Sequence, residues 1–387
     1  MTSRDSIDNI RQWLLERGVE AEKIDAALAE DQVHLLVADR MVMPEEPCYT
    51  GAEVAELTGL SEDQVKRLWR AMGFPDVPDD ERAFTERDVL ALTSVHGLLY
   101  LGLTNNEQMV QLTRVIGSSM ARIAEAEVES SPVLRGDASS IDIAELYVLA
   151  ADAIVPDVAR LLEYSWRRHL QAAVRRAALR RQGDGRPGGD AMAIGFADMV
   201  GFTVLSQQLS EGALAEVVGH FEELAYDTVG RLGGRVVKMI GDEVMFAVGT
   251  AGDAADIALA LSSAYADDEI LSEVRVGLAY GPVLLRDGDC YGPTVNLASR
   301  IVNIAAPGSV VVADDVYGLL KDDERFRWKP LRARYLKDIG RVALWVLYRR
   351  DEERNDRRSR RWLLRENMRQ QMERAQAIGR DVLSSGE

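Results

Sequence analysis

The chain has 387 residues, of which 47% are hydrophobic, and its formal net charge is −17. Two or three domains with packed cores are expected at this length and apolar content, and the negative charge argues against a general nucleic-acid binder. The two cysteines, Cys48 and Cys290, fall in different predicted domains, which excludes a disulfide framework and favours a cytoplasmic location.

The first 180 residues are predicted to be almost wholly helical, because apolar residues recur there at helical spacing. The segments with this spacing are 7–14, 21–40, 61–72, 86–101, 106–128, 141–162 and 157–177. The chain opens on polar residues, so no signal peptide is predicted. The longest apolar stretch, 89–103, is too short and too polar to cross a membrane. We therefore expect a helical domain over residues 1–164 and no transmembrane segment.

Residues 49–72 predict a helix–turn–helix and resemble the start of a MerR-type DNA-binding domain. In that interpretation Lys66, Arg67 and Arg70 contact DNA. The alternative is a helical hairpin kept as a packing module, with Trp69 in its core. Residues 41–95 hold twelve acidic and five basic residues, a balance that makes entry into a DNA groove unfavourable. The packing module is therefore the favoured interpretation, and no nucleic-acid partner is expected.

A linker is predicted over residues 165–189. Its helical part becomes basic, and it then runs into 182–189, Gln-Gly-Asp-Gly-Arg-Pro-Gly-Gly. Glycine and proline in such density interrupt regular structure. A hinge is expected directly before the first strand of the second half.

The second half predicts strands alternating with helices, with a carboxylate at the end of each of two strands. Asp198 follows one apolar run and Asp242 follows another, and residues 206–232 between them predict one amphipathic helix. Two carboxylates brought together in this way fit a pair of divalent metal ions, and two metal ions fit phosphoryl transfer on a nucleotide.

A third motif follows another predicted strand, 274–280. In the run 289–300, Asn296 and Arg300 stand four residues apart, so on a helix they project from one face. An arginine in that position can hold a phosphate with a planar fork of donors.

With these motifs in this order, residues 190–350 resemble the catalytic domain of class III nucleotide cyclases, specifically adenylyl cyclases. The layout of the whole chain also resembles soluble actinobacterial cyclases with an N-terminal helical regulatory domain, some of which respond to pH. The resemblance implies an α+β architecture: an all-α regulatory domain followed by a ferredoxin-like βαββαβ catalytic core with an added hairpin.

The resemblance also implies the metal site. Asp198 and Asp242 match the family's two metal-binding aspartates, with the backbone carbonyl of Met199 as a further ligand. They would hold two Mg²⁺ or Mn²⁺ ions, one acting on the ribose 3′-hydroxyl and the other on the triphosphate. Phe202 and Thr203 lie in the turn whose backbone would bind phosphate oxygens.

The nucleotide site is implied in the same way. Lys238 and Asp289 match the pair that reads adenine, and guanylyl cyclases of the family carry Glu and Cys there. Asn296 matches the residue that orients the ribose, and Arg300 the one that stabilises charge on the α-phosphate. Lys337 matches the lysine that binds the terminal phosphates, although Asp338 follows it where the family usually has glycine.

The resemblance implies that ATP becomes 3′,5′-cyclic AMP and pyrophosphate at a site shared by two copies of the chain, a homodimer. Three alternatives stay open. The chain could be a DNA-binding regulator whose cyclase-like half senses nucleotide. It could have guanylyl or dual specificity, which Lys238 and Asp289 disfavour. The turn at Gly241 and Asp242 also resembles diguanylate cyclases, but residue 240 is Ile where that family has Gly.

Residues 351–387 predict a basic amphipathic tail. The segment 349–374 holds ten arginines among acids, with apolar residues at helical spacing. Such a tail could dock on the dimer or make peripheral contact with anionic lipid. A solvated amphipathic helix is the favoured interpretation.

Overall fold

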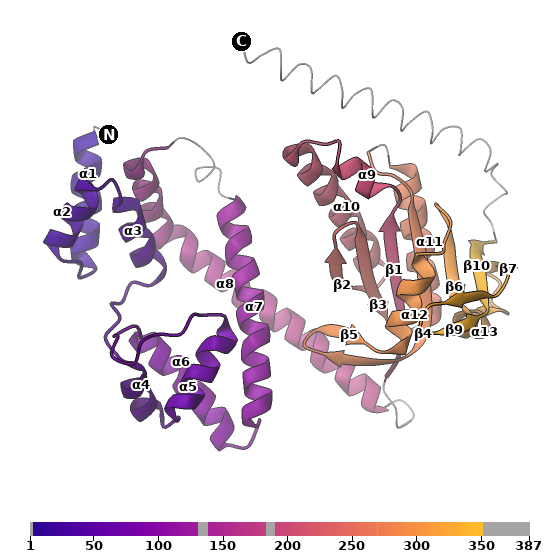
Figure 1. The fold of residues 1–387 in the computed structure, drawn as a ribbon, viewed down its shortest axis with the longest axis horizontal. Coiled ribbons are helices and arrows are strands. Elements are labelled where there is room, and N and C mark those ends of the chain that lie inside the picture. Colours follow the sequence, from indigo (N-terminus) through magenta and orange to yellow (C-terminus); the bar gives the residue numbers. More distant parts are fainter. Residues whose placement is uncertain (1–2, 131–137, 183–189, 269, 351–387) are drawn as a thin grey trace, which may run out of the picture. The chain divides into compact units, whose positions relative to one another are not determined.

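The computed structural model describes residues 3–130, 138–182, 190–268 and 270–350. Two compact units divide the chain, residues 1–183 and 184–387, and each is described by itself (Figure 1). The boundary between them lies inside the predicted linker, 165–189. The predicted tail, 351–387, lies outside the described residues.

The secondary structure of the first unit is almost wholly helical in its described part, as predicted. Its helices are α1 (Ser3–Glu16), α2 (Ala21–Ala29), α3 (Val33–Val42), α4 (Gly51–Thr58), α5 (Glu62–Met72), α6 (Glu86–Tyr100), α7 (Asn106–Ser130) and α8 (Ser140–Gln182).

Three of the predicted helices are divided or joined differently in the structure. The predicted helix 21–40 is two helices, because the backbone reverses at Asp31, whose φ is 57°, a left-handed value that interrupts a helix. The segments 141–162 and 157–177 form one helix, α8, of 43 residues. Pro156 lies inside α8, so this proline does not end the helix.

Two separate cores stabilise the first unit. One is formed by α1, α2, α3 and the beginning of α8, and includes Ile10, Leu14 and Ala144, none of which has any exposed surface. The other lies among α4, α5, α6 and α7 around Val54 and Leu68.

The predicted helix–turn–helix is present as α4 and α5. Thr50 and Ser61 cap the two helices through reciprocal side-chain and backbone hydrogen bonds, and Gly59 ends α4 in a left-handed conformation. Trp69 packs against Phe84, with 4.8 Å between ring centroids. These contacts are those of a packed helical hairpin.

The second unit contains one large sheet and a small one. Its elements are β1 (Asp190–Met199), α9 (Phe202–Ser206), α10 (Glu211–Arg231), β2 (Arg235–Ile240), β3 (Glu243–Val248), α11 (Ala251–Asp267), β4 (Val274–Arg286), β5 (Asp289–Tyr291), α12 (Pro293–Val302), β6 (Val310–Ala313), α13 (Asp314–Leu320), β7 (Phe326–Pro330), β8 (Arg334–Leu336), β9 (Gly340–Val342) and β10 (Leu344–Arg349). The single helix predicted over 206–232 begins later, at Glu211, where the Ser210 hydroxyl accepts a hydrogen bond from the backbone N–H of Ala213.

The order of strands in the large sheet is β2-β3-β1-β4-β6-β10-β7, with β5 paired to β4. Its first four strands, with α10 and α11 as connections, form the predicted ferredoxin-like βαββαβ core, and their pairings are antiparallel. The pairing of β4 with β6 is parallel. The small sheet consists of β8 and β9 and is the added hairpin.

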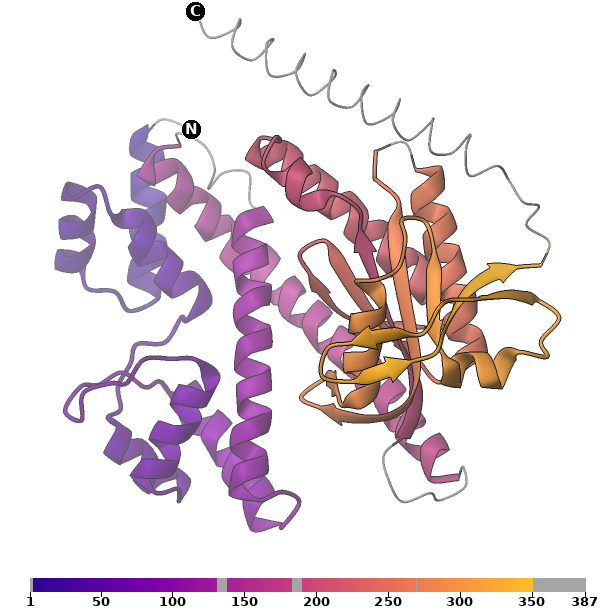
Figure 2. The ribbon, with the colours of Figure 1, turned by 45° about the vertical axis from the view of Figure 1, so that its right-hand side comes forward.

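Alternate residues of β1 face two different cores, as the two-residue period of a strand requires. Ala193 and Ala197 belong to the core that contains Phe221 of α10 and residues of α11. Ile194 and Phe196 belong to the core that contains Ile301 of α12. The sheet therefore lies between α10 and α11 on one face and α12 on the other (Figure 2).

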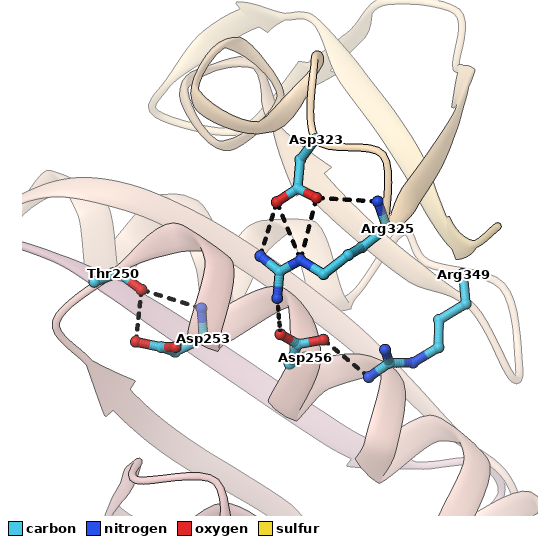
Figure 3. Close-up of polar contacts among 6 residues, drawn as sticks. All are labelled: Thr250, Asp253, Asp256, Asp323, Arg325 and Arg349. Atoms are coloured by element: carbon cyan, nitrogen blue, oxygen red, sulfur yellow. Dashed lines mark hydrogen bonds and ion pairs between the residues drawn. The ribbon is translucent and has the colours of Figure 1, made fainter.

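One carboxylate ties the C-terminal strands to α11 (Figure 3). Asp256 of α11 accepts from Arg325, which precedes β7, at 2.5 Å and from Arg349, the last residue of β10, at 2.9 Å. Asp323 accepts further hydrogen bonds from Arg325. Beside this group, the Thr250 hydroxyl accepts from the backbone N–H of Asp253 and caps α11.

Candidate active site

The structure brings together the two segments that carry Asp198 and Asp242. Asp198 lies near the end of β1, and Asp242 lies in the turn between β2 and β3, where Gly241 adopts a left-handed φ of 63°. The backbone N–H of Met199 donates to the carbonyl of Asp242 at 3.0 Å. This bond joins the turn to the strand end and fixes the two aspartates as neighbours in space.

Two further charged groups surround this pair. Glu243 is the register partner of Asp198 on β3, and Arg275 is its partner on β4. The Arg275 Nε donates to the Asp198 Oδ2 at 2.6 Å, and the Asp198 side chain is only 15% exposed.

Negative charge is crowded at this strand end. Burial, and then the neighbouring Asp198, raises the pKa of Asp242 above its usual value. Burial, with Asp198 and Asp242 nearby, raises the pKa of Glu243 to about 7. The carboxylates thus oppose one another's ionisation, and Arg275 offsets only part of their charge.

Crowded carboxylates of this kind fit a hard divalent cation, which takes oxygen ligands and would relieve their repulsion. In the described part of the chain, no group of three or more His, Cys, Asp or Glu side chains stands in positions to hold a metal ion. A metal here would therefore depend on Asp198 and Asp242 together with oxygens that are not side-chain carboxylates, in keeping with the predicted carbonyl of Met199.

Lys238 and Asp289 meet across two strands. The Lys238 Nζ on β2 lies 2.5 Å from the Asp289 Oδ2 on β5. The backbone N–H of Cys290 donates to the other carboxylate oxygen at 2.7 Å. Burial favours a higher pKa for Asp289, but the hydrogen bond from Lys238 and the N–H of Cys290 outweigh it and hold that pKa below its usual value. Asp289 is therefore an ionised acceptor beside a cationic donor.

Asn296 and Arg300 are carried by α12, as predicted, and both side chains are exposed. The helix reaches its place because β4 has glycine at position 277. An added Cβ there would stand 2.4 Å from the backbone nitrogen of Val302 and 2.7 Å from the carbonyl oxygen of Ala298. The close approach of α12 to β4 thus depends on the absence of a side chain at Gly277.

The remaining predicted residues lie in two turns. Lys337 is exposed in the turn between β8 and β9. The next residue, Asp338, has a left-handed φ of 64°, and its Oδ2 lies 4.0 Å from the Arg300 Nη2. Phe202 begins α9, half-buried against the core of α10 and α11, while Thr203 beside it is exposed.

Sequence reasoning missed Arg275 and Glu243. Both were visible only as members of predicted strands, and their approach to Asp198 follows from the strand register. Arg235 was missed for the same reason: it donates to the carbonyl of Gly288 at 3.0 Å and so holds the hairpin that carries Asp289.

Comparison with known proteins finds a matching domain family for each half of the chain. Residues 2–173 match the adenylate cyclase regulatory domain, and residues 187–349 match the adenylate and guanylate cyclase catalytic domain. An adenylate cyclase of Streptomyces coelicolor is 36% identical over 341 residues, which are 80% of this chain and 88% of the relative. The chain belongs to the adenylate cyclases.

This adenylate cyclase is also similar to a pH-sensitive adenylate cyclase of Mycobacterium tuberculosis, at 30% identity over 90% of this chain and 89% of the relative. Among solved structures it is similar to the catalytic core of a rhodopsin-guanylyl cyclase with converted specificity, in complex with ATPαS. That match has 25% identity and a TM-score of 0.39, and covers 42% of this chain and 97% of the other. Within its described residues, this adenylate cyclase has no helix with the length and apolar character needed to span a membrane.

Proposed function

We propose that two copies of this adenylate cyclase convert ATP to 3′,5′-cyclic AMP and pyrophosphate at two equivalent sites between their catalytic domains. One copy supplies Asp198 and Asp242 to a site. The other copy supplies the residues that bind the nucleotide, namely Lys238, Asp289, Asn296, Arg300 and Lys337. Both sets are present in a single chain, so a symmetric homodimer completes both sites.

The contact between Lys238 and Asp289 is the observation that carries the choice of ATP. Adenine presents a ring-nitrogen acceptor and an exocyclic amine donor, which match an ammonium donor and a carboxylate acceptor. Guanine presents the opposite pattern at those atoms. The ionised state of Asp289, held by Lys238 and the N–H of Cys290, supports its role as the acceptor.

The rest of the site acts on the sugar and phosphates. Asn296 orients the ribose so that its 3′-oxygen stands in line with the bond that breaks. The 3′-hydroxyl gives its proton to water or to the substrate, and its oxygen attacks the α-phosphorus. The bond from the α-phosphorus to the oxygen bridging the β-phosphorus breaks, which releases pyrophosphate. Arg300 stabilises the charge that develops on the α-phosphate.

Divalent metal is part of this proposal. Mg²⁺ or Mn²⁺, two ions per site, would be held by Asp198 and Asp242 and would supply Lewis-acid activation of the 3′-hydroxyl and neutralisation of the triphosphate. The crowding that raises the pKa values of Asp242 and Glu243 supports a cation in this place.

The shared site has a direct test in mixtures of inactive variants. Asp198→Ala and Arg300→Ala should each abolish formation of cyclic AMP from ATP with Mn²⁺, and a mixture of the two should regain activity. A heterodimer of the variants holds one site with both sets intact. If heterodimers form and the mixture stays inactive, the shared site is wrong.

A role in DNA binding is disfavoured by the ion pairs of the helical hairpin. The Lys66 Nζ lies 2.6 Å from the Asp79 Oδ1, and the Arg70 Nε lies 3.6 Å from the Asp76 Oδ1. Two of the three bases that would contact DNA thus face carboxylates of the segment that follows α5. Turnover of ATP together with no salt-sensitive affinity for duplex DNA would separate the two functions.

A further inference from the structure

The turn between β8 and β9 places a carboxylate beside the arginine assigned to the α-phosphate. Asp338 lies in this turn directly after Lys337, and its backbone is left-handed, with φ 64°. Glycine adopts this conformation without cost, and Asp and Asn are among the few other residues that adopt it readily. The turn therefore carries a carboxylate at a position whose backbone geometry favours glycine.

The contact between Asp338 and Arg300 does little to hold the fold. Their closest atoms, Oδ2 and Nη2, are 4.0 Å apart, and the two side chains are 72% and 48% exposed. This separation is too long for a hydrogen bond, and an exposed ion pair contributes little to stability. The consequence of the carboxylate is electrostatic, and it falls on Arg300.

The hairpin around this acid is otherwise basic. Residues 334–342 contain Arg334, Lys337 and Arg341, and Asp338 is their only acid. All four side chains are exposed, and a basic exposed hairpin suits the binding of phosphates. Asp338 thus introduces one negative charge into a positive surface, on the side of the turn that approaches Arg300.

We propose that Asp338 is an affinity-setting residue that competes with the phosphates of the nucleotide for Arg300. The inference rests on the proposed function of Arg300. With no nucleotide bound, the carboxylate partly neutralises the guanidinium. When the triphosphate arrives, repulsion from the same carboxylate weakens its binding, and it weakens the binding of the pyrophosphate product in the same way.

The test compares Asp338→Asn and Asp338→Gly with the full-length wild-type chain. The Asn variant removes the charge and keeps the size of the side chain, while the Gly variant removes the side chain altogether. Binding of 3′-deoxy-ATP, which lacks the attacking hydroxyl, is measured by calorimetry, and inhibition by pyrophosphate and the KM for ATP are measured by cyclic AMP formation. Both variants should lower all three constants by about threefold to tenfold at low salt, as expected for one nearby charge.

Three further measurements show whether the effect comes from competition for Arg300: its dependence on salt, the value of kcat, and the same substitution in an Arg300→Ala variant. The effect should shrink as salt screens the carboxylate, and kcat should not fall, since the substitution removes a charge that opposes both the substrate and the transition state. In an Arg300→Ala background, Asp338→Asn should change the affinity for 3′-deoxy-ATP by a smaller factor, because only the direct repulsion between the carboxylate and the phosphates remains. Asp322→Asn, the same change of charge at an exposed acid ahead of β7, is the matched control and should leave the constants at the wild-type values.

The outcomes that overturn the proposal are equally specific. An unchanged affinity for 3′-deoxy-ATP at low salt would show that the carboxylate does not compete. A lower kcat with an unchanged KM would show that Asp338 positions Arg300. If the wild-type chain bound the analogue and made no cyclic AMP from ATP, the proposed function would fail, and the affinities of the two variants would still decide the role of Asp338.

Discussion

At the scale of single residues, the site is arranged as opposed charges in two places. Asp198 faces Arg275, and Asp289 faces Lys238. In both pairs the carboxylate is the more buried partner, with 15% and 23% of its side chain exposed. A buried carboxylate stays ionised when a cation or hydrogen-bond donors compensate its desolvation. Lys238 and the N–H of Cys290 compensate Asp289, which favours the ionised form that its proposed role as acceptor for the base requires.

The pair that reads the base predicts a change of specificity. The double substitution Lys238→Glu with Asp289→Cys should remove the preference for ATP over GTP, because it reverses the hydrogen-bonding pattern. Loss of buried pairing partners typically costs about 1–3 kcal/mol, or roughly one to two decades of selectivity. The measurement is kcat/KM for both nucleotides with Mn²⁺.

The matched control reverses the charge of a lysine that is not assigned to the base. Lys321→Glu alters an exposed lysine after α13 and should leave the ratio of ATP to GTP turnover unchanged. An unaltered ratio in the double variant would mean that Lys238 and Asp289 do not read the base.

At the scale of elements, the sequence predicted the types of structure better than the contacts between them. The strands before Asp198 and Asp242, the helix between them and the strand 274–280 followed from apolar runs and their period, whereas the full βαββαβ order was implied by the family resemblance. The spacing of Asn296 and Arg300 on one helix was right. The contact of Arg275 with Asp198 could not be predicted, because it depends on strand register. The break at Asp31 was missed, as was the union of the segments 141–162 and 157–177 in one helix, because tertiary packing overrides local signals of this kind.

Because α12 lies close to β4 at Gly277, a single methyl group added at this position should lower stability and activity. Gly277→Ala places a Cβ against the backbone of α12, which cannot yield as a flexible side chain does. Overpacking of this kind costs about 1–3 kcal/mol of stability. A shift of the helix of about 1 Å would also displace Asn296 and Arg300 and lower activity by up to about 100-fold.

The control for this prediction is Gly219→Ala on α10. Gly219 is exposed, and an added Cβ there meets nothing within 4 Å. This variant should be at least as stable as the wild type in urea unfolding and fully active. A Gly277→Ala variant with wild-type stability and turnover would show that a methyl group fits between β4 and α12.

The carboxylate of Asp268 joins the end of α11 to α10 and predicts a dependence of stability on pH. Its Oδ2 lies 2.8 Å from the His220 Nε2, and its Oδ1 accepts from the backbone N–H groups of Ile270 and Leu271. Burial favours a higher pKa for Asp268, but these N–H groups and His220 outweigh it and hold the pKa below its usual value. The ionised form is thus favoured in the folded state.

A lowered pKa in the folded state stabilises the protein above the unfolded pKa, about 4, and that stabilisation is lost as pH falls through the folded value. Asp268→Asn keeps the oxygen that accepts from the backbone and removes the charge. It should lower the free energy of unfolding by about 1 kcal/mol at neutral pH. The difference from the wild type should shrink below about pH 4 in urea titrations. A difference that is constant with pH would show that the charge contributes nothing.

At the scale of the whole molecule, the chain joins a regulatory domain to a catalytic domain over a short segment. The 43-residue helix α8 belongs to the first unit and ends at Gln182, and β1 begins at Asp190. The same strand carries Asp198. Because the proposed site forms between two catalytic domains, a displacement of α8 transmitted to β1 would alter catalysis without any change in the site residues. A misaligned state that is more stable by only about 1.4 kcal/mol would lower activity about tenfold.

Histidines make a response to pH the natural hypothesis for this regulation. His169 is exposed on α8 among arginines, and His220 contacts Asp268 and lies 3.9 Å from Glu223. Imidazole changes its charge near neutral pH, so either group could shift the balance between aligned and misaligned states. His220 is held by Asp268, whereas His169 lies on α8, the helix whose displacement would reach β1.

Deletion of residues 1–185 is expected to change the specific activity and to flatten its dependence on pH, because the catalytic domains would then meet without α8. The measurement is cyclic AMP formation from ATP across pH, with substrate and Mn²⁺ saturating at every point, so that titration of ATP or metal binding does not imitate regulation.

The variant His169→Gln in the full-length chain distinguishes an effect of this imidazole from an effect of the whole regulatory domain. It should flatten the pH profile of activity near neutral pH, and sedimentation should still show a dimer. His96→Gln, a substitution in the first unit away from α8, is the control and should leave the profile as it is. If the truncated chain dimerises and reproduces both the rate and the pH profile of the full-length chain, the first 185 residues do not regulate catalysis.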